Sequence, residues 1–156
     1  MERWSVEVGE RGSDGALKWR SGGAGTRLKE SGLAAEDRHH NLRVRTKAYA
    51  SRIIHLYVQV QQAHHFNDAA PVLAKQLLRS ATSVAANHRE AKHTRSKADR
   101  LAKFHIILQE LEECALWLES FSEHAMAPPD ELRELLDETN QLIGIFITSI
   151  RTLREQ

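Results

Sequence analysis

Apolar side chains recur at alternating steps of three and four residues through four consecutive segments, from Leu42 to Leu153. This spacing places them on one face of an α-helix, so each segment is predicted to be an amphipathic helix. The segments are separated by short stretches near His64, His93 and Pro128. Because short connections force neighbouring helices to run antiparallel, the sequence predicts an all-α fold, an up-down-up-down four-helix bundle.

Within this pattern, the third segment carries two apolar rows. They are predicted to form the seam that packs against the other helices, with Leu101, Leu108 and Ala115 in one row and Phe104, Leu111 and Leu118 in the other. Ser96, followed three residues later by Asp99, has the form of a helix start, and Asp130 offers a cap for the fourth helix.

The first forty residues differ from the rest of the chain. Seven of the eight glycines lie between Gly9 and Gly32, and no helical or alternating apolar period persists there. Such a segment cannot bury enough apolar surface to fold, so residues 1–40 are expected to be a disordered extension. Residues 41–156 are expected to form one bundle domain, and a chain with 41% hydrophobic residues can supply its core.

Two further features bear on the cellular setting. No apolar run is long enough to span a bilayer, and the N-terminus lacks the layout of an export signal. The single cysteine, Cys114, excludes an internal disulfide framework and fits a reducing compartment. The sequence therefore predicts a cytoplasmic protein without a membrane partner.

A strip of polar residues runs beside the apolar face of the second helix. It consists of Arg79, Ser83, Asn87 and Glu90, at steps of four, four and three. A polar strip that borders a core needs partners, because buried polar groups must be hydrogen-bonded. Two interpretations remain open: a structural polar network at a helix or subunit contact, or a solvated flank of the bundle.

Charge is unevenly distributed, although the net charge is only +1. Residues 41–107 hold twelve basic and three acidic side chains, whereas residues 108–156 hold three basic and eleven acidic ones. The basic excess either pairs with the acidic helices or is displayed to a polyanion such as RNA. The candidate nucleic-acid-binding residues flank the turn between the second and third helices: Arg89, Lys92, Arg95, Lys97, Arg100 and Lys103. No aromatic residue lies among them, so base stacking is not expected.

Enzyme classes fit the sequence less well. A di-iron bundle needs two Glu-x-x-His pairs and two further glutamates, but only Glu90 and His93 have that spacing within the bundle. A magnesium-dependent pyrophosphohydrolase needs acidic clusters on two helices, and Glu112 and Glu113 lack a further acid one turn later. No phosphate loop or activated nucleophile is visible. We therefore expect no catalytic residue, no metal and no cofactor.

The segment from Leu73 to Glu90 resembles a family of small bacterial four-helix-bundle proteins, through the order R-x-x-x-S-x-x-x-N-x-x-E. The family includes proteins encoded in intervening sequences of large-subunit ribosomal RNA genes, and accessory variability proteins of diversity-generating retroelements. The resemblance covers about residues 42–153. Family members commonly have an apolar or aromatic residue after the asparagine and often glycine after the glutamate, where this chain has His88 and Ala91.

The resemblance implies a ring-like homopentamer without established catalytic activity. In the retroelement branch it also implies a basic surface that binds nucleic acid and a reverse transcriptase. Together with the charge pattern, it favours a non-enzymatic oligomer that binds RNA, DNA or a ribonucleoprotein. A purely structural protein–protein adaptor and a metal-dependent bundle enzyme remain the alternatives.

Overall fold

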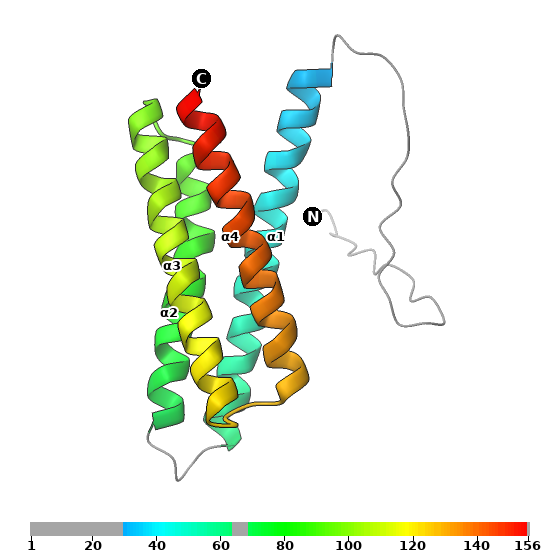
Figure 1. Ribbon diagram of the computed structural model, residues 1–156, viewed down its shortest axis with the longest axis vertical. Coiled ribbons are helices and arrows are strands. Elements are labelled where there is room, and N and C mark those ends of the chain that lie inside the picture. The colour runs from blue at the N-terminus through cyan, green and yellow to red at the C-terminus, as the bar shows by residue number, and fades with distance from the viewer. Residues whose placement is uncertain (1–29, 64–68, 156) are drawn as a thin grey trace, which may run out of the picture.

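The computed structural model describes residues 30–63 and 69–155, with side chains from residue 41 onward. These residues form four α-helices: α1 (Glu30–Ala63), α2 (Ala69–Ala91), α3 (Lys97–Glu123) and α4 (Pro129–Glu155). Successive helices run in opposite directions (Figure 1). The prediction of an all-α, antiparallel four-helix bundle is confirmed.

Helix α1 begins earlier than the sequence predicts. The expected extension reaches residue 40, but the helix starts at Glu30. Residues 33–40 contain no glycine or proline, and Ala34, Ala35 and Glu36 favour helix, so α1 can continue upstream of its apolar stripe. Residues 1–29, which are also predicted to be disordered, lie outside the described residues.

Each helix packs closely on its neighbours in the sequence, α1 on α2, α2 on α3 and α3 on α4. Helices α1 and α4 approach closely at few positions (Figure 1). There, Arg45 donates to both carboxylate oxygens of Glu138, at 2.6 and 2.8 Å, and Arg52 donates to Glu134 at 3.0 Å. Bidentate arginine–carboxylate pairs have a restrictive geometry. These pairs therefore help to hold α1 in place on the side where backbone packing is sparse.

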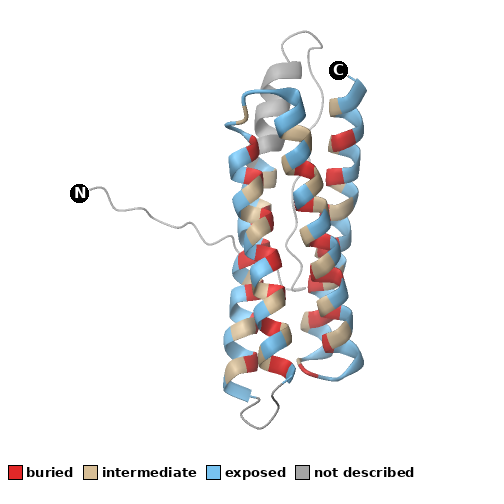
Figure 2. Cartoon of the chain, turned by 90° about the vertical axis from the view of Figure 1, so that its left-hand side faces the viewer, coloured by how far each residue is buried: buried red, intermediate tan, exposed pale blue. Residues whose placement is uncertain are grey.

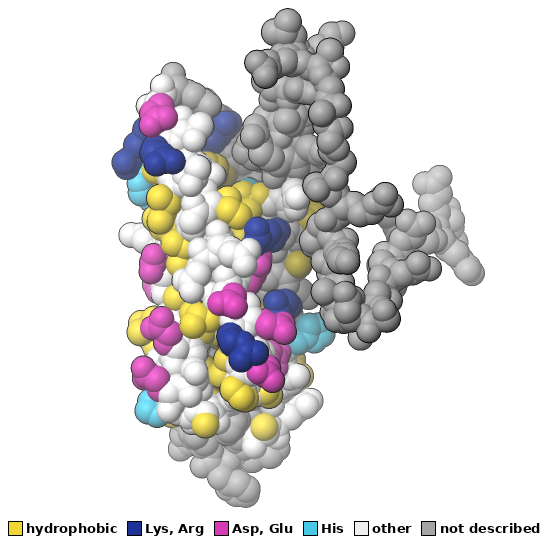
Figure 3. Space-filling model, turned by 45° about the vertical axis from the view of Figure 1, so that its right-hand side comes forward, with side chains coloured by type: hydrophobic (Ala, Val, Ile, Leu, Met, Phe, Trp, Pro, Cys, Tyr) yellow, Lys and Arg dark blue, Asp and Glu magenta, His cyan; other side chains and the backbone are white. Residues whose placement is uncertain are grey.

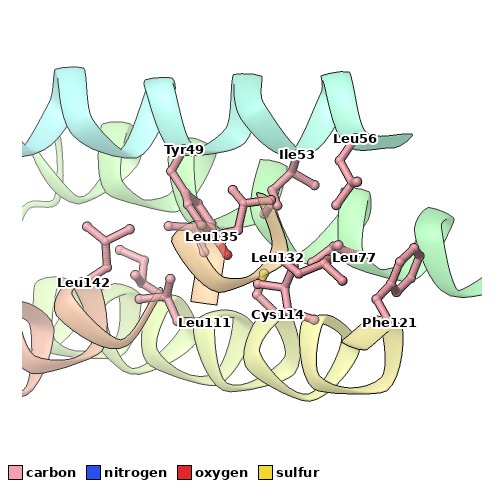
Figure 4. Packing of buried hydrophobic residues seen from close by; sticks show 14 of the residues in the cluster. Tyr49, Ile53, Leu56, Leu77, Leu111, Cys114, Phe121, Leu132, Leu135 and Leu142 are labelled. Atoms are coloured by element: carbon pink, nitrogen blue, oxygen red, sulfur yellow. The ribbon is translucent and has the colours of Figure 1, made fainter. Parts of the chain in front are cut away.

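The core runs the length of the bundle and is lined by the inward strip of each helix (Figure 2). The predicted stripes of α1 and α4 supply Thr46, Tyr49, Ile53, Leu56, Val60, Leu132, Leu135, Thr139, Leu142, Phe146 and Ile150. Figure 4 shows Tyr49 of α1 pointing into the space where Leu111 and Leu135 also point. Burial of these side chains, at about 25 cal/mol per Å² of apolar surface, is the main favourable term in folding.

The buried face of α3 agrees with the prediction in part, since Phe104, Leu111, Ala115 and Leu118 are buried. Leu101 and Leu108 are only half-buried, whereas Ile107, Cys114 and Phe121 are fully buried. Helix α3 has apolar residues around much of its circumference, so periodicity alone does not select the row that faces the centre. Packing between two neighbours makes the selection, and the row of Leu101 and Leu108 lies toward α4.

The helix ends show one confirmed cap and one wrong prediction. Ser96 caps α3, since its hydroxyl accepts a hydrogen bond from the Asp99 backbone N–H at 3.0 Å. Asp130 does not cap α4 but lies in its first turn, because the helix already begins at Pro129, a residue well suited to the first helical position. In the first turn its carboxylate still stabilises the positive end of the helix dipole.

A small polar cluster lies inside the core, where Tyr49, Cys114 and Thr139 meet. Thr139 donates to the Leu135 carbonyl at 2.7 Å, so the Tyr49 hydroxyl, 2.7 Å away, donates to Thr139. Burial raises the pKa of the Cys114 thiol to about 12. The thiol therefore stays protonated and unreactive at neutral pH.

The buried thiol predicts a loss of stability at alkaline pH. An unfolded cysteine has a pKa of about 8.5, whereas the pKa of folded Cys114 is about 12. Above pH ~8.5 the unfolded state ionises first, so the free energy of unfolding falls until the folded thiol also ionises. The Cys114→Ala variant should lose this component, up to about 1.4 kcal/mol per pH unit, in urea unfolding between pH 8 and 10.5. A pH dependence unchanged by the substitution would contradict this expectation.

Candidate functional site

The polar strip of α2 faces α3 along the outer rim of the bundle. We call the two facing rows the polar seam: Arg79, Ser80, Ser83, Asn87 and Glu90 on α2, and Lys103, Glu110 and Glu113 on α3. Only Ser80 is fully buried, while Ser83 and Asn87 are half-buried and Glu90 is exposed. The seam therefore lies at the boundary between core and solvent.

Asn87 is the central residue of the upper seam. Its amide nitrogen donates to the Ser83 carbonyl at 3.0 Å and to the Ser83 hydroxyl at 3.1 Å, and that hydroxyl donates to Glu110 Oε1 at 2.8 Å. Lys103 Nζ donates to Asn87 Oδ1 at 3.1 Å and to Glu90 Oε2 at 2.6 Å. Asn87 thus links serine and lysine through both ends of its amide, and these bonds join α2 to α3.

The lower seam contains a residue that the sequence did not identify. Ser80 donates to Glu113 Oε2 at 2.8 Å. Ser80 lies three residues after Leu77, on the apolar face of α2. A polar residue on that face needs a buried partner, so its position could have predicted a role in the seam. Arg79 is 3.7 Å from the same carboxylate and its side chain is 72% exposed. Such a pair contributes little to stability.

The candidate nucleic-acid-binding residues lie at one end of the bundle but are not equally available. Arg89, Lys92, Arg95 and Lys97 are exposed. Arg100 is half-buried, and its Nε is buried and has no hydrogen-bond acceptor among the described residues. Lys103 is held by Asn87 and Glu90 and belongs to the seam, so its ammonium group is already partly neutralised.

The last turns of α4 bring two further arginines to the same end. Arg154 donates to His105 Nε2 at 3.1 Å, while His105 Nδ1 lies 2.7 Å from the Leu101 carbonyl. Since a carbonyl only accepts, Nδ1 carries the proton and Nε2 accepts from the guanidinium. Lys97 Nζ donates to the Arg154 carbonyl at 3.2 Å. Arg151, one turn earlier on α4, is exposed.

We call this surface the basic end: Arg89, Lys92, Arg95, Lys97, Arg100, Arg151 and Arg154. Figure 3 shows Lys and Arg side chains gathered at the upper end of the bundle, with Asp and Glu side chains mostly lower on the same face. The sequence does not indicate that Arg151 and Arg154 belong to this surface, because they lie about fifty residues along the chain from the basic turn. Antiparallel packing of α4 on α3 brings them there.

His88 stands where the resemblance leads us to expect an apolar or aromatic residue, and its environment accounts for the difference. The ring is buried and packs edge-on against Phe146, with the centroids 5.8 Å apart, and Phe146 packs on Phe104 at 5.6 Å. The histidine therefore occupies an aromatic position in the core, where edge-to-face contacts are favourable.

The described part of the chain offers neither a metal site nor a membrane span. There, no three His, Cys, Asp or Glu side chains gather in a group that could hold a metal ion. Glu90, which has the spacing of a metal ligand with His93, is bound to Lys103. Within the same residues, every helix is too short or too polar to cross a bilayer.

The upper seam predicts a cost for removing its central amide. Asn87→Leu leaves Lys103 without one acceptor and the Ser83 hydroxyl without one donor, so we expect a loss of about 1–3 kcal/mol in the free energy of unfolding. The matched control is Asn140→Leu, at an exposed position of α4, which should change it by less than about 0.5 kcal/mol. Equal effects of the two substitutions in urea unfolding would contradict a structural role for the seam.

The family model of the 23S rRNA-intervening sequence protein matches residues 40–148. Among solved structures, the chain is similar to a protein of unknown function from the S23 ribosomal protein family of Bacteroides thetaiotaomicron. That similarity has a TM-score of 0.64 at 29% sequence identity and covers 69% of this chain and 96% of the other. No match is found among curated proteins. The family match includes parts of all four helices and the whole polar seam, and the chain belongs to the 23S rRNA-intervening sequence protein family.

Proposed function

We propose that this protein is a self-assembling, non-enzymatic bundle that binds the phosphate backbone of nucleic acid through its basic end. The observation that carries the proposal is the convergence of cations from α2, α3 and α4 at one end of the molecule. RNA is the favoured target, because the family is described by its relation to 23S ribosomal RNA. Such a target would also fit the predicted cytoplasmic location.

The chemistry of the basic end favours phosphate over bases. Its seven residues are all lysine or arginine, and most of them are exposed. The nearest Phe, Tyr or Trp in sequence, Phe104, is buried in the core, so it is not available to stack on unpaired bases. Contacts to phosphate carry no sequence information directly, and we expect binding with strong salt dependence and little sequence selectivity.

Self-assembly would strengthen this binding. A ring such as the homopentamer that the family resemblance implies would display several copies of the basic end on one particle. Linked sites bind a long polyanion far more tightly than one site alone, because each later contact is intramolecular. A reverse transcriptase or ribonucleoprotein partner would use the same surface.

The state of the cysteine thiol also supports a role in binding and not in catalysis. The one cysteine is buried, with a thiol pKa of about 12, and nucleophilic cysteines need a thiolate near neutral pH. An adaptor that binds another protein is the second candidate. It is favoured by Leu116 and Ile147, large apolar side chains that are about half-exposed on α3 and α4.

Charge reversal at the basic end tests the proposal. The variant Arg95→Glu with Lys97→Glu should weaken binding to a short RNA duplex by at least about tenfold at roughly 50 mM salt, with a shallower salt slope. Fluorescence anisotropy across a salt series is the measurement. The matched control, Lys75→Glu with Arg133→Glu, changes the net charge equally away from the basic end and should retain binding.

Lys103 supplies an internal comparison. Since it is already bound by Glu90 and Asn87, Lys103→Gln should reduce duplex affinity less than Arg95→Gln does. Unchanged affinity in the Arg95 and Lys97 double variant would reject the basic end as the binding surface. Absence of any duplex binding by the unaltered protein at low salt would favour the adaptor instead.

A further inference from the structure

The middle of α3 carries two carboxylates with weak charge compensation: Glu110 has no ion pair among the described residues, and Glu113 has only a long one with Arg79. Glu110 accepts one hydrogen bond, from the Ser83 hydroxyl, and its Oε2 has no donor among the described residues. Glu113 accepts from the Ser80 hydroxyl, and its nearest cation is the mostly exposed Arg79 at 3.7 Å. Carboxylates removed from water are stabilised by charged donors more than by hydroxyls. This part of the polar seam is therefore electrostatically incomplete within one chain.

Exposed apolar side chains flank these carboxylates on the same side of α3. Ile106 is 37% exposed and Leu116 is 51% exposed; around the helix, Ile106 lies about 40° from Glu110, and Leu116 lies about 60° from Glu113 on the outward side. We call this row the acidic strip: Ile106, Glu110, Glu113 and Leu116. An apolar–acidic–apolar strip fits a partner surface that presents a cation between apolar side chains.

The outward side of α1 has the complementary composition. We call it the α1 strip: Val44, Lys47, Ile54 and Val58, which all lie within about a quarter of the helix circumference. Val44 is 54% exposed and Ile54 is 44% exposed. Lys47 is exposed too, and the described residues offer it no ion pair.

The two strips also lie at similar heights along the bundle. Figure 4 shows the side chains of Tyr49 on α1 and Leu111 on α3 at about the same position along the bundle axis, which gives a common level for these helices. Lys47 is about 3 Å and Glu110 about 1.5 Å above that level, at ~1.5 Å per residue. Helices α1 and α3 run in the same direction, so two upright copies could bring the strips together without a vertical shift.

We propose that the acidic strip of one copy receives the α1 strip of a second copy, with Lys47 pairing with Glu110 and Glu113. This inference rests on the self-assembly proposed above and specifies the faces that mediate it. The contact joins two different faces, so repetition generates a ring when the rotation closes. The partner copy would supply the cation that the seam lacks, and the apolar ends of both strips would be buried.

Mixing two charge-reversed variants tests this contact. Lys47→Glu alone and Glu110→Lys with Glu113→Lys should each raise the dissociation constant for self-association by at least about tenfold. An equimolar mixture should associate again, because each variant then meets an oppositely charged strip on the other. Sedimentation velocity over a dilution series measures the association of each variant and of the mixture, and circular dichroism verifies that the variants are folded. Glu119→Lys and Arg133→Glu, at exposed positions off both strips, should assemble normally.

Each result of this experiment supports or rejects the contact between the acidic strip and the α1 strip. If the unaltered protein assembles and Lys47→Glu assembles equally well, the contact lies elsewhere and this inference fails while self-assembly stands. If the unaltered protein is monomeric at high concentration, both proposals fail. Two weakened variants that do not associate when mixed also overturn the contact. Should Glu110→Lys destabilise the fold through Ser83, Glu113→Lys alone replaces the double variant, with the same mixing result expected.

Discussion

The hydrogen bond from Lys103 to Asn87 joins α3 to α2 at the rim of the apolar core, and the arrangement of the polar seam depends on it. With Asn87 linked to Ser83 on its own helix and to Lys103 on the next, the register between the two helices is defined by directional bonds. Apolar packing alone tolerates small slips, because similar side chains can exchange places. The register determines which side chains of α3 complete the seam and which cations of the α2–α3 turn stay exposed.

Ion pairs divide the basic residues into two groups. Arg45 and Arg52 pair with glutamates of α4, and Lys103 pairs with Glu90. The cations of the basic end form no ion pair among the described residues. Part of the basic excess is therefore neutralised within the bundle, and part is exposed at the basic end. That division makes the basic end the best-supported candidate for binding an rRNA-related polyanion.

The sequence predicted the fold well and the site in part. The four stripes and the Ser96 cap depend on local spacing, which a sequence displays directly. In α3 the predicted row of Phe104, Leu111 and Leu118 is buried, whereas Leu101 and Leu108 are only half-buried. A helix with apolar residues on several sides receives its exact orientation from its neighbours. Arg151 and Arg154 were missed because only tertiary packing brings α4 to the basic turn. The engagement of Lys103 was equally hidden, because Asn87 lies sixteen residues away along the chain.

A double-mutant cycle between Asn87 and Lys103 measures the seam most directly. Asn87→Ala, Lys103→Ala and the combined variant, compared by urea unfolding, isolate the interaction between these two side chains. The structure predicts a coupling free energy of about 1 kcal/mol or more, because the ammonium donates a charge-assisted bond to the half-buried amide oxygen. Additive effects within about 0.3 kcal/mol would contradict it, and would mean that apolar packing alone sets the register of α2 on α3.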